Sequence, residues 1–155
     1  MKKLFVVAVA IAMIAMGGTA MAVDTATVTV SAIVAQTCRF SSPTAALAFG
    51  TLPSTAAPVS ASTTLAFWCT TGASYTITDD DGLYEAGVNA NQMRSTALAT
   101  PQFMPYTLSY TPASGTGTGP SSPITMTLTG NILAASYASL PADVYQDTVT
   151  LTINP

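Results

Sequence analysis

Few residues of this 155-residue chain could do chemistry, because it has seven Asp and Glu, four Lys and Arg, two Cys and no His. His is the commonest general base and a frequent metal ligand, so its absence argues against most enzymes. Asp143 and Asp147 are near enough in sequence to suggest a carboxylate pair, but no feature of the sequence marks the cleft that would hold them about 5 to 9.5 Å apart. The alternative for both is a solvated position in a loop. We therefore expect no enzyme, no catalytic residue and no small-molecule cofactor.

The run Asp79-Asp80-Asp81-Gly82 invites interpretation as a calcium site. It lacks the alternate spacing of an EF-hand loop and the bidentate Glu at its end. Asp and Gly after a strand are also typical of a turn. We favour the turn and expect no metal site.

Cys38 and Cys69 are the only cysteines, and an exported chain reaches an oxidising compartment. Neither has a His, a Lys or a second Cys close in sequence, as a reactive thiol or a metal ligand would need. We predict a disulfide between them.

Export is predicted by the amino terminus. Lys2 and Lys3 precede an apolar run at 4–16, and the small-residue sequence Ala20-Met21-Ala22 follows. This pattern is typical of a secretory signal peptide over 1–22. The alternative, a membrane anchor, would rise only about 20 Å over 13 residues, against a hydrocarbon core of about 30 Å.

Cleavage after Ala22 would leave 133 of the 155 residues, with two Arg, no Lys and all seven acids. Such a chain has no basic patch that could release counterions from a phosphate backbone. The composition therefore excludes nucleic acid and anionic lipid as electrostatic partners.

Alternation of apolar with small polar residues, punctuated by Gly and Pro, predicts strands and no helix. The clearest segments are 26–34, 65–69, 74–79, 103–110, 124–129 and 144–153, and residues 112–123 are typical of a mobile hairpin loop. We predict an all-β fold, an immunoglobulin-like β-sandwich. Its expected core is Leu65, Phe67, Trp68, Ile77, Leu108, Met126, Leu128, Val149 and Leu151.

Residues 23–36 form an apolar, β-prone mature amino terminus, with Val and Ala on one side of an extended chain and Thr, Ser, Ile and Ala on the other. Residues 23–35 could span roughly 43 to 47 Å, enough to reach beyond their own domain. At the other end the chain stops two residues after its best strand. If that strand is the sixth of a sandwich, the seventh is missing and an edge is left unpaired. A free strand and a vacancy predict head-to-tail fibres, although 23–35 could instead be the first strand of a complete sandwich.

The sequence resembles the spore coat protein U domain family, which includes pilin subunits of archaic chaperone-usher pili. The resemblance rests on the alternating segment before Cys38, the stretch Phe49-Gly50-Thr51-Leu52, Cys69 at a strand end, and the ending 145–153. It covers essentially the whole mature chain.

The resemblance implies an incomplete immunoglobulin-like β-sandwich at 36–155, of six strands, with an amino-terminal donor strand at 23–35. A periplasmic chaperone would fill the groove first, and at an outer-membrane usher the donor strand of the next subunit would replace it. The donor side chains would be Ala26, Val28, Val30, Ala32 and Val34. The last strand would line the acceptor groove with Val149, Leu151 and Ile153.

Three functions follow as hypotheses. The first is a homopolymeric pilus subunit, exported through the periplasm to a surface fibre that serves adhesion and biofilm formation. The second is a spore or cell-surface coat protein that assembles by the same strand exchange. The third is a soluble exported enzyme or binding module, which should be a stable monomer when made without a chaperone.

Overall fold

The computed structural model describes residues 23–155 apart from 54 and 56, so the predicted signal peptide at 1–22 lies outside the described residues. The chain divides into two units, 1–33 and 34–155. Residues 23–33, the described part of the first unit, form no helix or strand, and their side chains are exposed. Among the described residues, no helix is long and apolar enough to cross a membrane.

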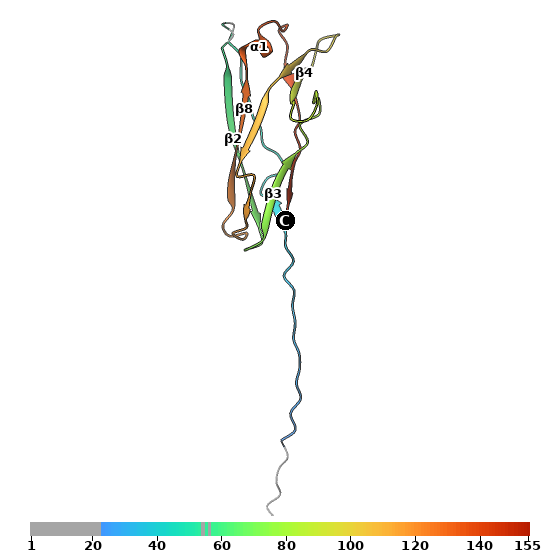
Figure 1. Ribbon diagram of the computed structural model, residues 1–155, viewed down its shortest axis with the longest axis vertical. Helices are drawn as coiled ribbons and strands as arrows, with labels where there is room; N and C mark the ends of the chain where they lie inside the picture. Colours follow the sequence, from blue (N-terminus) through green and yellow to red (C-terminus); the bar gives the residue numbers. More distant parts are fainter. Residues whose placement is uncertain (1–22, 54, 56) are drawn as a thin grey trace, which may run out of the picture. The chain divides into compact units, whose positions relative to one another are not determined.

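The second unit is built from antiparallel sheets, and the largest has four strands. Across it they are β1 (Cys38–Phe40), β2 (Val59–Cys69), β8 (Ile124–Ile132) and β6 (Thr107–Thr111). Strands β2 and β8 pair over nine residues, from Val59 opposite Ile132 to Phe67 opposite Ile124, and lie side by side in Figure 1. Alternate residues of both strands are buried, as a sheet with one face on the core requires.

The other two sheets have three strands each. One contains β10 (Leu151–Asn154), β3 (Ser74–Asp79) and β7 (Ser114–Thr116), in that order. The other contains β5 (Phe103–Pro105), β4 (Gln92–Ser95) and β9 (Tyr145–Gln146). The carboxyl-terminal strands β9 and β10 are both edge strands, and the carboxyl terminus lies beside β3 (Figure 1).

The core lies between strands of different sheets, which confirms the all-β, immunoglobulin-like sandwich. Phe67 and Met126 of the four-stranded sheet are fully buried and meet Tyr75 and Ile77 of β3. The rings of Phe67 and Tyr75 pack edge to face, with centroids 4.9 Å apart. The prediction of Trp68 as a core residue was wrong: it is only half-buried, because alternation along β2 gives the inward positions to Phe67 and Cys69.

The predicted disulfide is confirmed, since Cys38 and Cys69 are bonded and stand opposite each other in the β1–β2 pair. The neighbouring Thr70 secures the chain just before β1. Its hydroxyl accepts a hydrogen bond from the Thr37 amide at 3.0 Å, and its amide donates to the Thr37 carbonyl at 2.8 Å. Residues 34–37 therefore enter the domain at the end of β2.

Five local expectations need correction. The predicted strand 26–34 does not form a strand. The predicted strand 103–110 is split into β5 and β6, and the predicted strand 144–153 is split into β9 and β10. The supposed mobile loop 112–123 contains β7, whose ladder with β3 accounts for its order. A short helix, α1 (Ala134–Tyr137), follows β8 where none was expected.

Candidate functional site

The last segment of the chain, 145–154, keeps a strand-like alternation even where no ladder is formed. Side chains at odd positions from Tyr145 to Ile153 are half-buried, and those at even positions are exposed. Between β9 and β10 the turn after β3 takes the place of a paired strand. The Thr148 carbonyl accepts a hydrogen bond from the Leu83 amide at 3.0 Å, and the Thr150 carbonyl accepts one from the Asp80 amide at 3.2 Å.

The opposite side of this segment is an open edge. Successive peptide groups of an extended chain point to opposite sides. Because Thr148 and Thr150 bond toward the turn, the peptide groups of Val149 face the edge, as do those of Leu151 and Ile153 farther along. No hydrogen bond joins the Val149 peptide groups to any residue that the structure describes. The edge therefore offers donors and acceptors for another strand.

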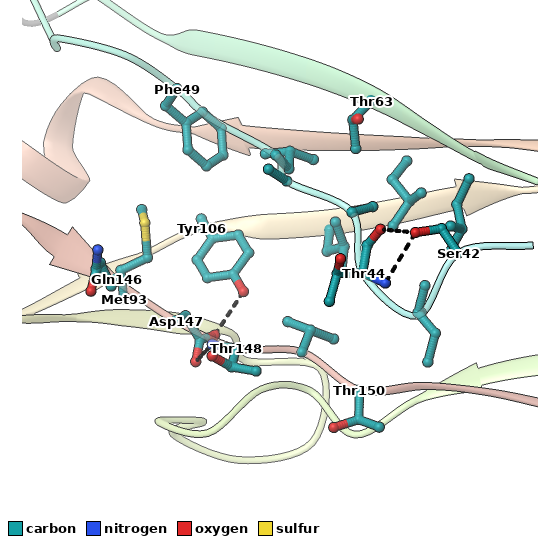
Figure 2. Close-up of a pocket in the computed structure, with 18 of the residues that line it drawn as sticks. Ser42, Thr44, Phe49, Thr63, Met93, Tyr106, Gln146, Asp147, Thr148 and Thr150 are labelled. Atoms are coloured by element: carbon teal, nitrogen blue, oxygen red, sulfur yellow. Dashed lines mark hydrogen bonds between the residues drawn. The ribbon is translucent and has the colours of Figure 1, made fainter. Parts of the chain in front are cut away.

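A groove of about 730 Å³ runs along this open edge. One wall is the segment that follows β1, from Ser42 to Phe49, and the other is 145–151 (Figure 2). The floor is formed by side chains of β2, β6 and β8, among them Leu65, Leu108 and Leu128. These are core side chains of one sheet that no strand covers at this position, so the groove has the shape and apolarity of a missing strand.

A close approach in β8 holds the first wall in place. A Cβ atom at Gly130 would lie 2.6 Å from Cζ of Phe49 and 2.9 Å from Cδ2 of Leu47. The absence of a side chain at this position therefore lets the 42–49 wall pack directly against the sheet.

A polar pair interrupts the apolar groove part-way along its length. The Tyr106 hydroxyl donates a hydrogen bond to Oδ2 of Asp147 at 2.7 Å, and both side chains point into the groove in Figure 2. Oδ1 of Asp147 accepts from the Leu83 amide at 3.0 Å and the Thr148 amide at 2.8 Å. Burial raises the pKa of Tyr106 well above its usual range, and the hydrogen bond to Asp147 adds to the effect. Tyr106 is therefore a neutral donor at every physiological pH.

A second hollow, of about 890 Å³, lies along the same edge farther toward α1. It shares Leu47, Phe49 and Tyr145 with the groove and adds Met104 and Ile132, together with the loop 138–144. The open space thus extends beyond β10 to the neighbourhood of β9.

The structure places the predicted acceptor residues unevenly. Val149 and Leu151 line the groove, whereas Ile153 stands opposite Ile77 in the β10–β3 ladder, packs against the core and is not part of the lining. The five predicted donor residues carry no strand and are exposed. Val28, Val30 and Val34 keep 80%, 89% and 82% of their surface exposed, which is unusual for apolar side chains.

The acidic residues that drew attention in the sequence hold loops in place. The Asp143 carboxylate accepts hydrogen bonds from the amides of Ala97, Leu98 and Val144, and the first of these lowers its pKa most. Asp79 accepts from the Tyr110 hydroxyl at 2.9 Å. Asp80 accepts from Gly82 and Thr150, as in an Asx turn. Asp143 and Asp147 bind backbone amides rather than each other.

Sequence reasoning missed the 42–49 wall, which carries no periodic signal of its own. It also missed Tyr106, because the alternation that predicts a strand at 103–110 does not show which distant side chains that strand meets. The ring of Phe49 packs edge to face against Tyr106, with centroids 6.3 Å apart. Phe49 belongs to the stretch Phe49-Gly50-Thr51-Leu52 that carried part of the family resemblance, so that stretch was an available signal for the wall.

Comparison with known proteins places this chain in a family. The model of the Spore Coat Protein U domain matches residues 24–152, which is most of the chain. The chain belongs to the Spore Coat Protein U domain family. The match takes in both the exposed segment before Cys38 and the last strand up to Thr152, so this Spore Coat Protein U domain includes its amino-terminal segment.

The fold of this Spore Coat Protein U domain is similar to that of a solved structure. It is the CsuC-CsuE chaperone-tip adhesion subunit pre-assembly complex from archaic chaperone-usher Csu pili of Acinetobacter baumannii. The TM-score is 0.51 and the identity 23%, over 77% of this chain and 40% of that chain, so the likeness shows a shared fold. No curated protein matches the sequence.

Proposed function

We propose that the mature chain is a structural subunit of a secreted surface fibre that polymerises by donor-strand complementation. In this proposal the segment 23–35 of one copy fills the groove of the next. The observation that carries the proposal is the apolar groove along an edge whose Val149 peptide groups have no partner among the described residues.

An unpaired edge over an uncovered core is unfavourable in water. Unsatisfied peptide groups need hydrogen bonds, and the half-buried apolar side chains of the groove, such as Leu108, Val149 and Leu151, gain free energy when they are covered. A single strand bound in the groove would supply both the hydrogen-bond partners and the apolar cover. Its peptide groups would pair with the edge at Val149 and Leu151, and its inward side chains would cover the floor.

The segment 23–35 has the properties of that strand. It is extended, belongs to no strand, and exposes Val28, Val30 and Val34 on its even-numbered side. Burial of three Val side chains at roughly 1.5 to 3 kcal/mol each contributes several kcal/mol before the new ladder is counted. A strand at one end of a domain and a groove elsewhere form a heterologous contact, which repeats from copy to copy and builds a fibre.

A subunit with an open groove needs protection until it is assembled. The similar structure is a chaperone-subunit pre-assembly complex from chaperone-usher pili. By this analogy a periplasmic chaperone would occupy the groove after export, and an outer-membrane usher would be the site of exchange. The fibre would stand at the cell surface and serve adhesion and biofilm formation.

Deletion of residues 23–35 behind an intact signal sequence tests the proposal. The shortened subunit, co-expressed with chaperone and usher, should still bind the chaperone through its groove but form no fibres. Size-exclusion chromatography of the periplasmic extract and electron microscopy of the cells measure the two properties. Fibres assembled from the shortened subunit alone would refute donor-strand assembly.

The family description favours a second candidate, a spore or cell-surface coat protein built by the same strand exchange. The two differ in architecture and not in the contact between subunits. Electron microscopy of the producing cells separates them, because thin filaments indicate a pilus and an amorphous layer indicates a coat.

A further inference from the structure

The groove is chemically uneven along its edge. Its inward positions are Tyr145, Asp147, Val149 and Leu151, and the next inward residue, Ile153, lies past its end. Val149 and Leu151 present apolar surface next to Leu108 and Leu128. At Asp147 the groove instead contains the Tyr106–Asp147 hydrogen bond, and the Tyr106 ring occupies the space beside it (Figure 2).

The donor segment is uneven in a matching way. Its even-numbered side carries Val at 28, 30 and 34 and Ala at 26 and 32. An Ala side chain adds little volume and has no polar group, so it leaves the Tyr106–Asp147 bond undisturbed. A Val at the same position would have to displace the ring or strain the bond.

The direction of the incoming strand follows from where each chain enters its own domain. Residues 34–37 enter at Cys38, beside Thr70. That is also the end at which β10 finishes, because Asn154 stands opposite Thr76 near the start of β3. If the donor strand ran parallel to 145–154, the domain that follows it would lie at this same end of the acceptor. The acceptor's own amino-terminal segment leaves there, so the two would overlap. An antiparallel donor leaves at the opposite end and avoids the overlap.

We propose that the donor strand enters antiparallel with Ala32 opposite Asp147, so that the Tyr106–Asp147 pair sets the register between subunits. This assignment rests on the proposed function. It places Val34 opposite Tyr145, Val30 opposite Val149 and Val28 opposite Leu151. Ala26 then falls opposite Ile153, past the end of the groove. Ala32 thus lies opposite the polar residue of the groove, and Ala26 lies past the end of the groove. All three valines lie opposite groove-lining residues that have apolar or aromatic side chains.

Neighbouring registers lose this agreement. A shift of two residues in one direction puts Val30 at Asp147 and the small Ala26 at Leu151. The opposite shift puts Val34 at Asp147 and Ala32 at Val149. In one other register an Ala also lies opposite Asp147, namely Ala26. That register places the charged Asp24 opposite Val149, where burial of a carboxylate is strongly unfavourable.

Engineered cysteine pairs in the full-length chain test the register. Directly opposite residues in an antiparallel ladder have Cα atoms about 5.5 Å apart, within the range that a disulfide spans. The pair Val30→Cys with Val149→Cys should give a ladder of covalent multimers from fibres on a non-reducing gel. The control pair, Val28→Cys with Val149→Cys, is shifted by two residues and should give at least tenfold less.

The outcomes separate the register from the function. Fibres that cross-link through the control pair, or through neither pair, overturn the register and leave donor-strand assembly standing. Absence of fibres from the unsubstituted chain expressed with chaperone and usher overturns both.

A pair of Ala substitutions tests the role of the polar pair without new cysteines. Ala32→Leu should reduce the amount of fibre at least tenfold, because the larger side chain meets Tyr106. The matched control Ala26→Leu should assemble within about twofold of the unsubstituted chain, because its position lies past the groove. Equal assembly of both variants, or a defect confined to Ala26→Leu, would overturn the assignment.

Discussion

The Asp80 carboxylate accepts a hydrogen bond from the Thr150 amide at 2.8 Å, while the Asp80 amide donates to the Thr150 carbonyl at 3.2 Å. Asp80, in the turn after β3, thus provides hydrogen-bond partners for both the amide and the carbonyl of Thr150. A longer β3–β10 ladder would have provided the same two partners. The pKa of Asp80 is lowered, chiefly by the bond from Thr150. This contact keeps 147–150 extended and leaves Val149 facing the open edge.

Replacement of this carboxylate should loosen the edge. We expect Asp80→Ala to reduce the free energy of unfolding by about 1 kcal/mol, since the lost hydrogen bonds are charge-assisted but exposed to solvent. Thermal unfolding of the mature chain should show a midpoint lower by roughly 3 to 5 °C. Asp80→Asn, which keeps an acceptor oxygen, should lose less. An unchanged midpoint in Asp80→Ala would show that the contact does not support the edge.

Stability should fall in acid. The folded chain holds Asp80 and Asp143 ionised to lower pH than their ordinary pKa of 3.8, so protonation favours unfolding. Their contribution should be fully present above about pH 5 and lost as the pH falls below 4. Melting temperatures from pH 2.5 to 8 measure this, and the acid limb of Asp80→Ala should be shallower. A parallel pair of curves would contradict the assignment to Asp80.

The alkaline side has a different origin. Burial, with a hydrogen bond to Asp79, raises the pKa of Tyr110 to about 12. Because the unfolded chain loses this proton nearer to pH 10, stability should decline above pH 10. Tyr110→Phe should remove part of that decline, as ultraviolet titration and melting curves would show.

Loss of the disulfide should weaken the domain as a whole. Cys38 and Cys69 are separated by 31 residues, and the chain-entropy model assigns a loop of this length roughly 3.5 kcal/mol. Cys38→Ser should lower the periplasmic yield and the melting temperature, and reduction of the unsubstituted chain should reproduce the effect. Unchanged yield and melting temperature would show that the bond contributes nothing.

A charge on the inner side of the donor segment should block assembly. Val30→Asp places a carboxylate where the proposed register has Val149, in an apolar groove, and is expected to abolish fibres. Chaperone binding should persist, because it uses the variant's own groove. Thr29→Asp carries the same charge on the outer side and is the matched control. Fibres from Val30→Asp, or their loss in both variants, would count against residue 30 as an inward position.

Much of the fold was accessible from local pattern. Period-2 alternation located β2, β3 and β8, because burial on one face imposes that period on any strand. The two cysteines, in a chain with a predicted signal peptide, predicted their bond. The prediction was wrong at Trp68, which was assigned to the core. Alternation along β2 places Phe67 and Cys69 inward, so the Trp68 side chain points to the other face. The pattern also failed to show where strands 103–110 and 144–153 are interrupted, because hydrogen bonds from distant residues such as Asp80 decide this.

The sequence by itself predicted the two halves of the proposed contact: an apolar alternating segment before Cys38 and a β-prone alternating segment at 148–153. These are local properties of composition and spacing. Only the tertiary structure decided that 145–151 lies at an edge, that 42–49 forms the facing wall, and that Tyr106 and Asp147 meet inside the groove. Those relationships join residues up to about a hundred positions apart, and no local pattern records which distant side chains the folded sheets bring together.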